Sequence, residues 1–290
     1  MDIWESRLHG GWLSDRFHYM SWAFSCLQLR SFYDEVELVT DGAGKALLID
    51  LLGLPYSSFS VRLDEINDYD RDLWALGKLY TYSLQDKPFL HVDGDIFIWR
   101  PFDGKMMSRP VIGQHLELQH KYYHKVMKMV DDHLPYIPQP IADYRKFSRH
   151  INAVNAGLLG GNDVSFIRDY CREALSFVNL NMPYLHRIER GPFNCIYEQV
   201  LLYCMVHERK KELGLFTRTI GEKRINNEIN HLYKLRKAPE GVDYIHLFGS
   251  NKRRPMYCAA LAAQLKRTHR SYYDRIMDLT TAEIPSLQYA

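Results

Sequence analysis

Hydrophobic and polar positions alternate along the chain with two spacings, one typical of helices and one of buried strands. Apolar residues at helical spacing predict helices over 18–33, 45–52, 69–84, 162–178, 192–208 and 256–279. Short apolar runs predict strands over 2–6, 36–39, 89–92, 110–113, 152–159 and 242–247. Asn162 is the predicted N-cap of the fourth helix. Helices alternating with buried strands indicate an α/β protein that binds ligands at strand ends.

The domain organisation predicted from this pattern is simple. We find no internal repeat and no long linker, so we expect a single domain over 1–290. The segment 114–150 interrupts the alternation, because it is rich in histidine, tyrosine and proline and reads as a long irregular insertion. Such an insertion either selects the acceptor substrate beside a site or forms a surface flap without ligand contacts.

The most informative segment is 88–102, PFLHVDGDIFIWRPF, where two carboxylates interrupt an apolar run. Residues i and i+2 of an extended chain point the same way, so Asp93 and Asp95 can converge on one ion. Gly94 between them lets the backbone bend. Carboxylates beside a buried strand are costly unless positive charge lies against them. A hard divalent cation, Mg²⁺ or Mn²⁺, satisfies the pair and keeps positions open for phosphates of a ligand.

A second informative segment, IHLFGSNKRRP, follows the last predicted strand and contains an H-x-x-G-x-x-K arrangement. The imidazole of His246 is a suitable third ligand for Mn²⁺ beside two carboxylates, although a single histidine is more often structural. Gly249 permits close approach of a phosphate, and Lys252 can offset the charge of that phosphate. The two segments together therefore favour a cation and a diphosphate held in one place.

Three further features have both a structural and a functional interpretation. Asn155-Ala156-Gly157 either lets a sugar lie against the backbone or forms a turn that needs glycine. The pair Glu198-Gln199 lies on a predicted apolar helix, where the sequence alone favours a solvent-facing position over one in a site. Lys78 is either a solvated lysine or a contact to the donor.

Composition narrows the class of protein and its compartment. A net charge of +2 gives no indication of nucleic acid as a partner. Five cysteines without a C-x-x-C pair, together with a start that resembles no signal peptide, lead us to expect a cytoplasmic protein. The basic segment 256–290 is either a solvated face or a surface that contacts anionic lipid, nucleic acid or a protein partner.

In order and spacing these motifs resemble those of the GT-A glycosyltransferases, and among them the glycogenin-like retaining families. The resemblance runs from about 36 to 255, and the matching positions are Lys78, Phe89–Val92, Asp93, Asp95, Asn155–Gly157, Glu198, Gln199, His246, Gly249 and Lys252. It implies a Rossmann-like mixed central sheet flanked by helices. The pair that is usually Asp-Gln in those families is Glu198-Gln199 here.

The resemblance also implies roles for individual residues. Asp93, Asp95 and His246 would hold Mn²⁺ or Mg²⁺. The donor would be contacted by Asp41, Lys78, Asp93, Gly94, Asp95, Ala156, Gly157, Gly249 and Lys252. Gln199, Asn155 and Glu198 would lie near the reacting carbon. No nucleophile is evident from the sequence, so attack on the front face of the sugar with help from the leaving phosphate is the expected route.

We therefore expect a metal-dependent glycosyltransferase that moves a sugar from a nucleotide-diphosphate sugar, UDP-linked, to an acceptor hydroxyl with retention. The acceptor can be a glycan, a lipid-linked sugar, a protein or a small molecule. Two alternatives stay open at this point. One is a metal-dependent nucleotidyltransferase or phosphotransferase, which usually needs more acids for a two-metal site. The other is a non-catalytic protein that binds nucleotide-sugars or glycans.

Overall fold

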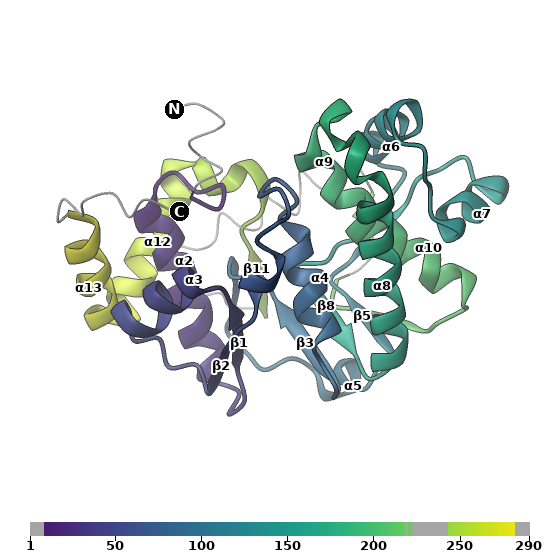
Figure 1. The fold of residues 1–290 in the computed structure, drawn as a ribbon. Helices are drawn as coiled ribbons and strands as arrows, with labels where there is room; N and C mark the ends of the chain where they lie inside the picture. Colours follow the sequence, from purple (N-terminus) through teal and green to yellow (C-terminus); the bar gives the residue numbers. More distant parts are fainter. Residues whose placement is uncertain (1–8, 218–219, 222–242, 282–290) are drawn as a thin grey trace. The chain divides into compact units, whose positions relative to one another are not determined.

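Helices and short strands alternate along the chain in the computed structural model, which describes residues 9–217, 220–221 and 243–281 (Figure 1). This confirms the predicted mixed α/β class. The residues group into two compact units. The first draws on Met1–Arg62, Gly94–Pro101 and Ile229–Ala290, and the second on Leu63–Asp93 and Phe102–Glu228. The prediction of one domain over 1–290 stays a prediction.

Within the part of the chain that the structure describes, the first unit contains two strand pairs and three long helices. Its elements are α2 (Asp15–Arg30), β1 (Glu37–Thr40), α3 (Gly42–Lys45), a π-helix (Ala46–Leu51), β2 (Ser58–Val61), β4 (Ile96–Ile98), β11 (Tyr244–His246), a 3-10 helix (Gly249–Arg253), α12 (Pro255–Thr268) and α13 (Arg270–Thr281). β1 pairs with β2 in parallel, and β4 pairs with β11 antiparallel, with His246 opposite Ile96. The buried rings of Phe24 on α2 and Phe97 on β4 lie 5.1 Å apart, so this pair of strands packs on α2.

The second unit is built around a mixed four-stranded sheet in the order β3-β8-β5-β9. Its elements are a 3-10 helix (Leu63–Ile66), α4 (Ala75–Ser83), β3 (Phe89–Val92), α5 (Gly104–Met107), β5 (Val111–Gly113), β6 (Leu116–Leu118), α6 (Lys121–His133), α7 (Gln139–Phe147), β7 (Ala153–Val154), β8 (Leu158–Gly161), α8 (Val164–Asn181), a 3-10 helix (Met182–Arg187), α9 (Arg190–Cys195), a π-helix (Ile196–Val200), α10 (Leu201–Glu208), β9 (Leu213–Leu215) and β10 (Ile220–Gly221).

Strand β8 is the centre of this sheet, because it pairs antiparallel with both β3 and β5 (Figure 1). Its glycines make the close spacing possible. A Cβ on Gly160 would lie 2.0 Å from the carbonyl oxygen of Phe89, and one on Gly161 would lie 2.2 Å from that of Pro110. A second, three-stranded sheet has the order β10-β6-β7. Helices α4 and α8 pack against each other beside the apolar core of this unit.

Several predicted boundaries are corrected by the structure. The helix expected over 69–84 begins at Ala75, because Asp70 accepts a hydrogen bond from the backbone N–H of Asp72 and holds a turn there. The helix expected over 256–279 is broken at His269, and both halves, α12 and α13, pack on α2. Asp163 rather than Asn162 caps α8: its carboxylate accepts from the N–H of Phe166, whereas Asn162 donates to Ser108.

The segment 114–150 is more regular than expected. It contains β6, α6 and α7, and α6 buries Tyr123, Val126, Met127 and Val130 at helical spacing. The strand expected over 152–159 is divided into β7 and β8, because residues 155–157 form a turn. The strand expected over 2–6 lies outside the described residues. Among the helices that the structure describes, none combines the length and the apolar character needed to span a bilayer.

Candidate functional site

The acidic segment is a turn between β3 and β4 rather than a continuous strand. The backbone N–H of Asp93 donates to the carbonyl oxygen of Gly157 (3.0 Å), and the carbonyl of Gly94 accepts from the hydroxyl of Ser21 (2.6 Å). A Cβ on Gly94 would lie 2.9 Å from the ring of Trp22, so glycine is needed at the bend. The chain leaves the second unit and enters the first at this turn.

In the first unit, Asp95 lies between a histidine and a lysine. Antiparallel pairing of β4 with β11 brings Nε2 of His246 to 3.2 Å from Oδ1 of Asp95, and the N–H of Leu247 donates to the carbonyl of Asp95. Nζ of Lys252 lies 2.6 Å from the second carboxylate oxygen, Oδ2. Burial would raise the pKa of Asp95, but the charges of Lys252 and His246 outweigh burial and hold that pKa well below its usual value.

The lysine comes from the 3-10 helix Gly249–Arg253, which directly follows β11. Gly249 starts this helix with φ +61°, a left-handed conformation that favours glycine, and no heavy atom lies within 4 Å of the place where its Cβ would be. Nζ of Lys252 also donates to the carbonyl oxygen of Gly10 (3.1 Å). The H-x-x-G-x-x-K motif therefore combines an open backbone position at Gly249 with an ammonium that lies on Asp95.

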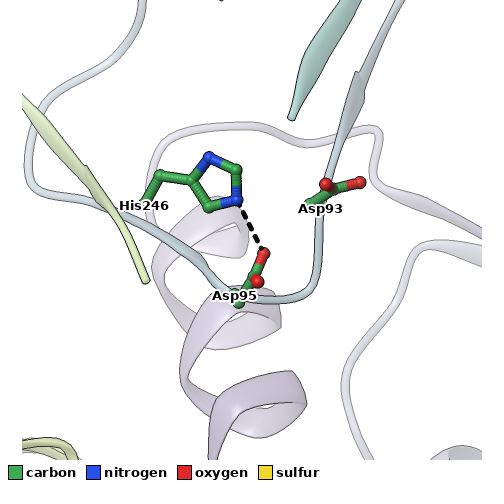
Figure 2. Close-up of side chains that lie close together, drawn as sticks. All are labelled: Asp93, Asp95 and His246. Carbon is green, nitrogen blue, oxygen red and sulfur yellow. Dashed lines mark ion pairs between the residues drawn. The ribbon is translucent and has the colours of Figure 1, made fainter. Parts of the chain in front are cut away.

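Three potential metal ligands converge at the acidic turn. One ligand atom from each of Asp93, Asp95 and His246 lies within 4.8 Å of the others (Figure 2). Figure 2 shows the imidazole of His246 directed at Asp95. Two carboxylates and one imidazole are a donor set that Mn²⁺ or Mg²⁺ accepts. The ammonium of Lys252 lies on Asp95, so a cation held there would have to displace it. The residues fit the predicted cation.

In the second unit, Asp93 shares a lysine with a buried glutamate. Nζ of Lys78, on α4, lies 3.1 Å from Oδ1 of Asp93 and 2.8 Å from Oε1 of Glu198, and it donates to the carbonyl of Ala156 (2.9 Å). The same ammonium donates to Oδ2 of Asp93 (3.4 Å), and its contact with Glu198 is an ion pair. Nε2 of His91 lies 2.9 Å from the same oxygen of Asp93.

Burial and neighbouring charges shift the pKa values of Lys78 and Glu198 with different outcomes. Burial disfavours the charge of Lys78, but Asp93 and Glu198 outweigh it and raise the lysine pKa above its usual value. Glu198 is fully buried, and burial raises its pKa even though Lys78 opposes the shift. The expectation from the sequence alone that Glu198 faces solvent is therefore wrong, and the default view of Lys78 as a solvated lysine is also wrong.

The segment Asn155–Gly157 serves as a support for this group. The side chain of Asn155 is buried; its Oδ1 accepts from the N–H of Gly157 (3.1 Å), which forms the turn between β7 and β8. The carbonyls of Ala156 and Gly157 then accept from Lys78 and from the N–H of Asp93. The side chain of Asp41 has a local role, because it caps α3 by accepting from the N–H of Gly44 (2.6 Å).

Two polar residues that the sequence analysis did not single out lie beside the predicted catalytic side chains. Glu117, on β6, accepts from Nδ2 of Asn155 (2.9 Å) and from the hydroxyl of Tyr123 (2.6 Å). The Tyr123 oxygen also lies 2.7 Å from the side-chain amide of Gln199. A signal was present in the sequence: Glu117 is an acid between two leucines of a strand-like run, and Tyr123 belongs to the apolar face of α6.

Comparison with known proteins gives a family but no activity. Residues 2–279 match DUF6734, a family of unknown function. The chain belongs to this family. No curated protein and no solved structure matches the chain. The DUF6734 match includes the acidic turn, the Asn-Ala-Gly segment and the H-x-x-G-x-x-K motif, so these features belong to the matched region.

Proposed function

We propose that this protein is a metal-dependent glycosyltransferase with a GT-A-like architecture. The donor would be a nucleotide-diphosphate sugar, UDP-linked, and the sugar would pass to an acceptor hydroxyl with retention. The observation that carries the proposal is the 3.2 Å approach of His246 to Asp95, since Asp95 directly precedes β4 and His246 ends β11, two paired strands that are far apart in the sequence. Asp93, the third ligand, is tied to Asp95 through Gly94.

In this proposal Asp93, Asp95 and His246 hold a divalent cation. When bound, the cation offsets the negative charge that builds on the diphosphate as the sugar leaves, which favours the transition state over the ground state. The remaining roles belong to the side chains that bind, orient and balance charge.

Lys252 would exchange partners when the donor binds. Its ammonium forms a close ion pair with Asp95. A divalent cation on Asp95 repels this ammonium, and a diphosphate offers it new anionic oxygens within the reach of a long, flexible side chain. Gly249, with an open backbone face in the same short helix, is suited to a close approach by a phosphate.

The group around Lys78 gives the second support. One ammonium lies between two carboxylates, those of Asp93 and Glu198. A carboxylate that shares its ammonium in a partly buried place favours binding of a further cation. Glu198 stays in its pair with Lys78 and so holds that ammonium in place. In this proposal Gln199 and Asn155 flank the reacting carbon of the sugar, as the resemblance implies.

The test begins with binding and continues to turnover. Purified protein is titrated with Mn²⁺ and with UDP, each alone and together, by calorimetry and thermal shift, because a ligand that binds the native state raises its stability. It is then incubated with a panel of UDP-sugars and Mn²⁺, and free UDP and free sugar are measured. We expect Mn²⁺-dependent binding of UDP and release of UDP, both abolished by chelator.

The matched variants are Asp95→Asn and Asp243→Asn. Asp95 is a proposed ligand, whereas Asp243 is an exposed acid that pairs loosely with Arg100 (3.6 Å). Asp95→Asn should lose Mn²⁺-dependent binding, and Asp243→Asn should retain it. Equal Mn²⁺ binding by wild type and Asp95→Asn would contradict the assigned ligands. Release of pyrophosphate in place of UDP would instead identify a nucleotidyltransferase.

A further inference from the structure

The second unit contains a buried carboxylate that the proposed cation and diphosphate do not use. Glu117 lies in the middle of β6, and its side chain is 12% exposed. Burial would raise its pKa, but hydrogen bonds from His115, Tyr123 and Asn155 outweigh burial and lower the pKa to about 2. Glu117 is therefore ionised near neutral pH. A carboxylate so firmly ionised is a weak base, and it acts as a hydrogen-bond acceptor.

The hydroxyl of Tyr123 lies between two acceptors but has only one hydrogen. Its oxygen is 2.6 Å from Oε2 of Glu117 and 2.7 Å from Oε1 of Gln199. An ionised carboxylate only accepts, so the hydrogen goes to Glu117. The Gln199 atom next to Tyr123 must then be a donor, which requires its amide to turn over and present Nε2. The oxygen and nitrogen of an amide exchange places in this turn, and the positions of the heavy atoms hardly change.

Glu117 also fixes the second amide side chain. Nδ2 of Asn155 donates to Oε1 of Glu117, so Oδ1 of Asn155 is the atom that accepts from the N–H of Gly157. The opposite orientation of Asn155 would place a carbonyl oxygen against a carboxylate and a donor against a donor. The carboxylate of Glu117 thereby fixes, for each amide, the positions of the oxygen and of the nitrogen.

We propose that Glu117, acting directly on Asn155 and through Tyr123 on Gln199, is the positioning residue that orients both amide side chains of the glycosyl-transfer site. This deepens the proposed function and rests on it. With Nε2 of Gln199 held by Tyr123, the carbonyl oxygen of this partly buried side chain is left to face the ligand. A carbonyl oxygen stabilises positive charge that develops on a sugar ring, whereas an amide NH₂ group repels it.

The decisive variant is Glu117→Gln, which keeps the shape of the side chain and removes its charge. The new amide can donate from Nε2 to Tyr123, whose hydroxyl then points at Gln199. The direction of the hydrogen bonds from Glu117 through Tyr123 to Gln199 is then reversed, and Gln199 presents its NH₂ group to the ligand in place of its carbonyl oxygen. Tyr123→Phe removes the hydroxyl that links Glu117 to Gln199 and leaves the hydrogen bond between Glu117 and Asn155 in place. Matched controls are Glu173→Gln and Tyr136→Phe, because Tyr136 donates to Glu173 (3.2 Å) in a similar pair.

The first readout does not need activity. Side-chain NH₂ resonances of Gln199 and Asn155 are assigned in ¹⁵N NMR spectra with Gln199→Glu and Asn155→Asp. We expect Glu117→Gln to shift both resonances, Tyr123→Phe to shift that of Gln199 and leave that of Asn155, and both controls to leave them unchanged. An unaltered Gln199 resonance in Glu117→Gln and Tyr123→Phe would overturn the inference.

The second readout separates positioning from folding. Glu117→Gln and Tyr123→Phe should lower kcat by about 10²-fold, the order expected for a misplaced reacting group, with KM for the donor and Mn²⁺ affinity within about twofold of wild type. A parallel loss of Mn²⁺–UDP binding would indicate a structural role only and would contradict the inference. If wild type turns over no UDP-sugar, the proposed function fails, and the NMR result alone still decides whether Glu117 orients the two amides.

Discussion

Asp93 and Asp95 are two residues apart and have the same chemistry, yet their surroundings differ in charge. Asp95 has a lysine of its own, Lys252 at 2.6 Å, and a histidine at 3.2 Å. Asp93 has a histidine as well, but its lysine, Lys78, is shared with the fully buried Glu198. Asp95 therefore forms an ion pair with an ammonium of its own, whereas Asp93 and Glu198 share one ammonium.

This difference indicates how the two carboxylates would respond to a cation. At Asp95 a cation would compete with the ammonium of Lys252, which would then be free to pair with other anions. At Asp93 a cation would leave Lys78 in its ion pair with Glu198. Because Asp93 shares its lysine with a buried acid, we expect the charge of Asp93 to depend more on a bound cation. The charge of Asp95 depends more on Lys252 and His246, which belong to the same unit.

The largest effect is expected from removing a proposed ligand. Asp95→Asn and Asp93→Asn should each reduce UDP-sugar turnover by at least about 10²-fold, the order seen when a charge that stabilises a transition state is lost. Turnover is measured as UDP release at saturating Mn²⁺, with Asp243→Asn as the control. Because Lys78 keeps its ion pair with Glu198 in Asp93→Asn, this variant should remain better folded than the Lys78 variant described next.

Lys78→Met should be the most destabilising single change at the site. It leaves the carboxylate of Glu198 buried without its ammonium, and breaking a buried pair costs about 3–5 kcal/mol. Lys211→Met is the matched control, because Lys211 pairs with Asp163 near the surface, where about 1 kcal/mol or less is expected. Urea unfolding measures both. A loss below 1 kcal/mol for Lys78→Met would show that Glu198 does not depend on this pair.

Two buried glutamates of the second unit should give opposite pH dependences. Hydrogen bonds to Glu117 outweigh its burial and lower its pKa from 4.5 to about 2, so it contributes stability above pH 4.5 that is lost as the pH falls toward 2, about 3 kcal/mol in all. Burial raises the pKa of Glu198 above 4.5, so its contribution is present below pH 4.5 and is lost as the pH rises through the raised pKa.

Unfolding free energies measured between pH 3 and pH 8 check these signs. Relative to wild type, Glu117→Gln should become less stable as the pH rises from 3 through 4.5. Glu198→Gln should become relatively more stable as the pH rises above 4.5, because it no longer carries a buried charge. Parallel curves for wild type and both variants would contradict the environments assigned to these two residues.

The smallest effect is expected at the turn between the aspartates. Gly94→Ala places a methyl group 2.9 Å from the ring of Trp22 and should cost about 1–3 kcal/mol through overpacking. Gly249→Ala meets open space and should cost only about 1–2 kcal/mol for its left-handed backbone. The double variant Gly94→Ala/Trp22→Leu should recover part of the loss, as a double-mutant cycle would show. Strict additivity would mean that the ring is not the obstacle.

Much of the local structure could be predicted from periodicity. Helices at 18–33, 45–52 and 192–208 and strands at 36–39 and 110–113 match observed elements within a few residues. Predictions failed where side chains bond to the backbone, as at Asp70 and Asn155, because such turns leave the apolar pattern unchanged. The prediction that 114–150 is an irregular insertion was also wrong. The apolar face of α6 is present in the sequence, but the histidines and prolines around it concealed the pattern.

The sequence by itself determined which residues carry charge at the candidate site and in what order, because a glycine between two aspartates and the H-x-x-G-x-x-K spacing are local features. Only the tertiary structure decided the partners. Pairing of β4 with β11 brings His246 to Asp95, and packing around α4 buries Glu198 on Lys78. The side chain determines whether a residue can carry a charge. The free energy of that charge depends on burial and on neighbours that the folded chain brings from elsewhere.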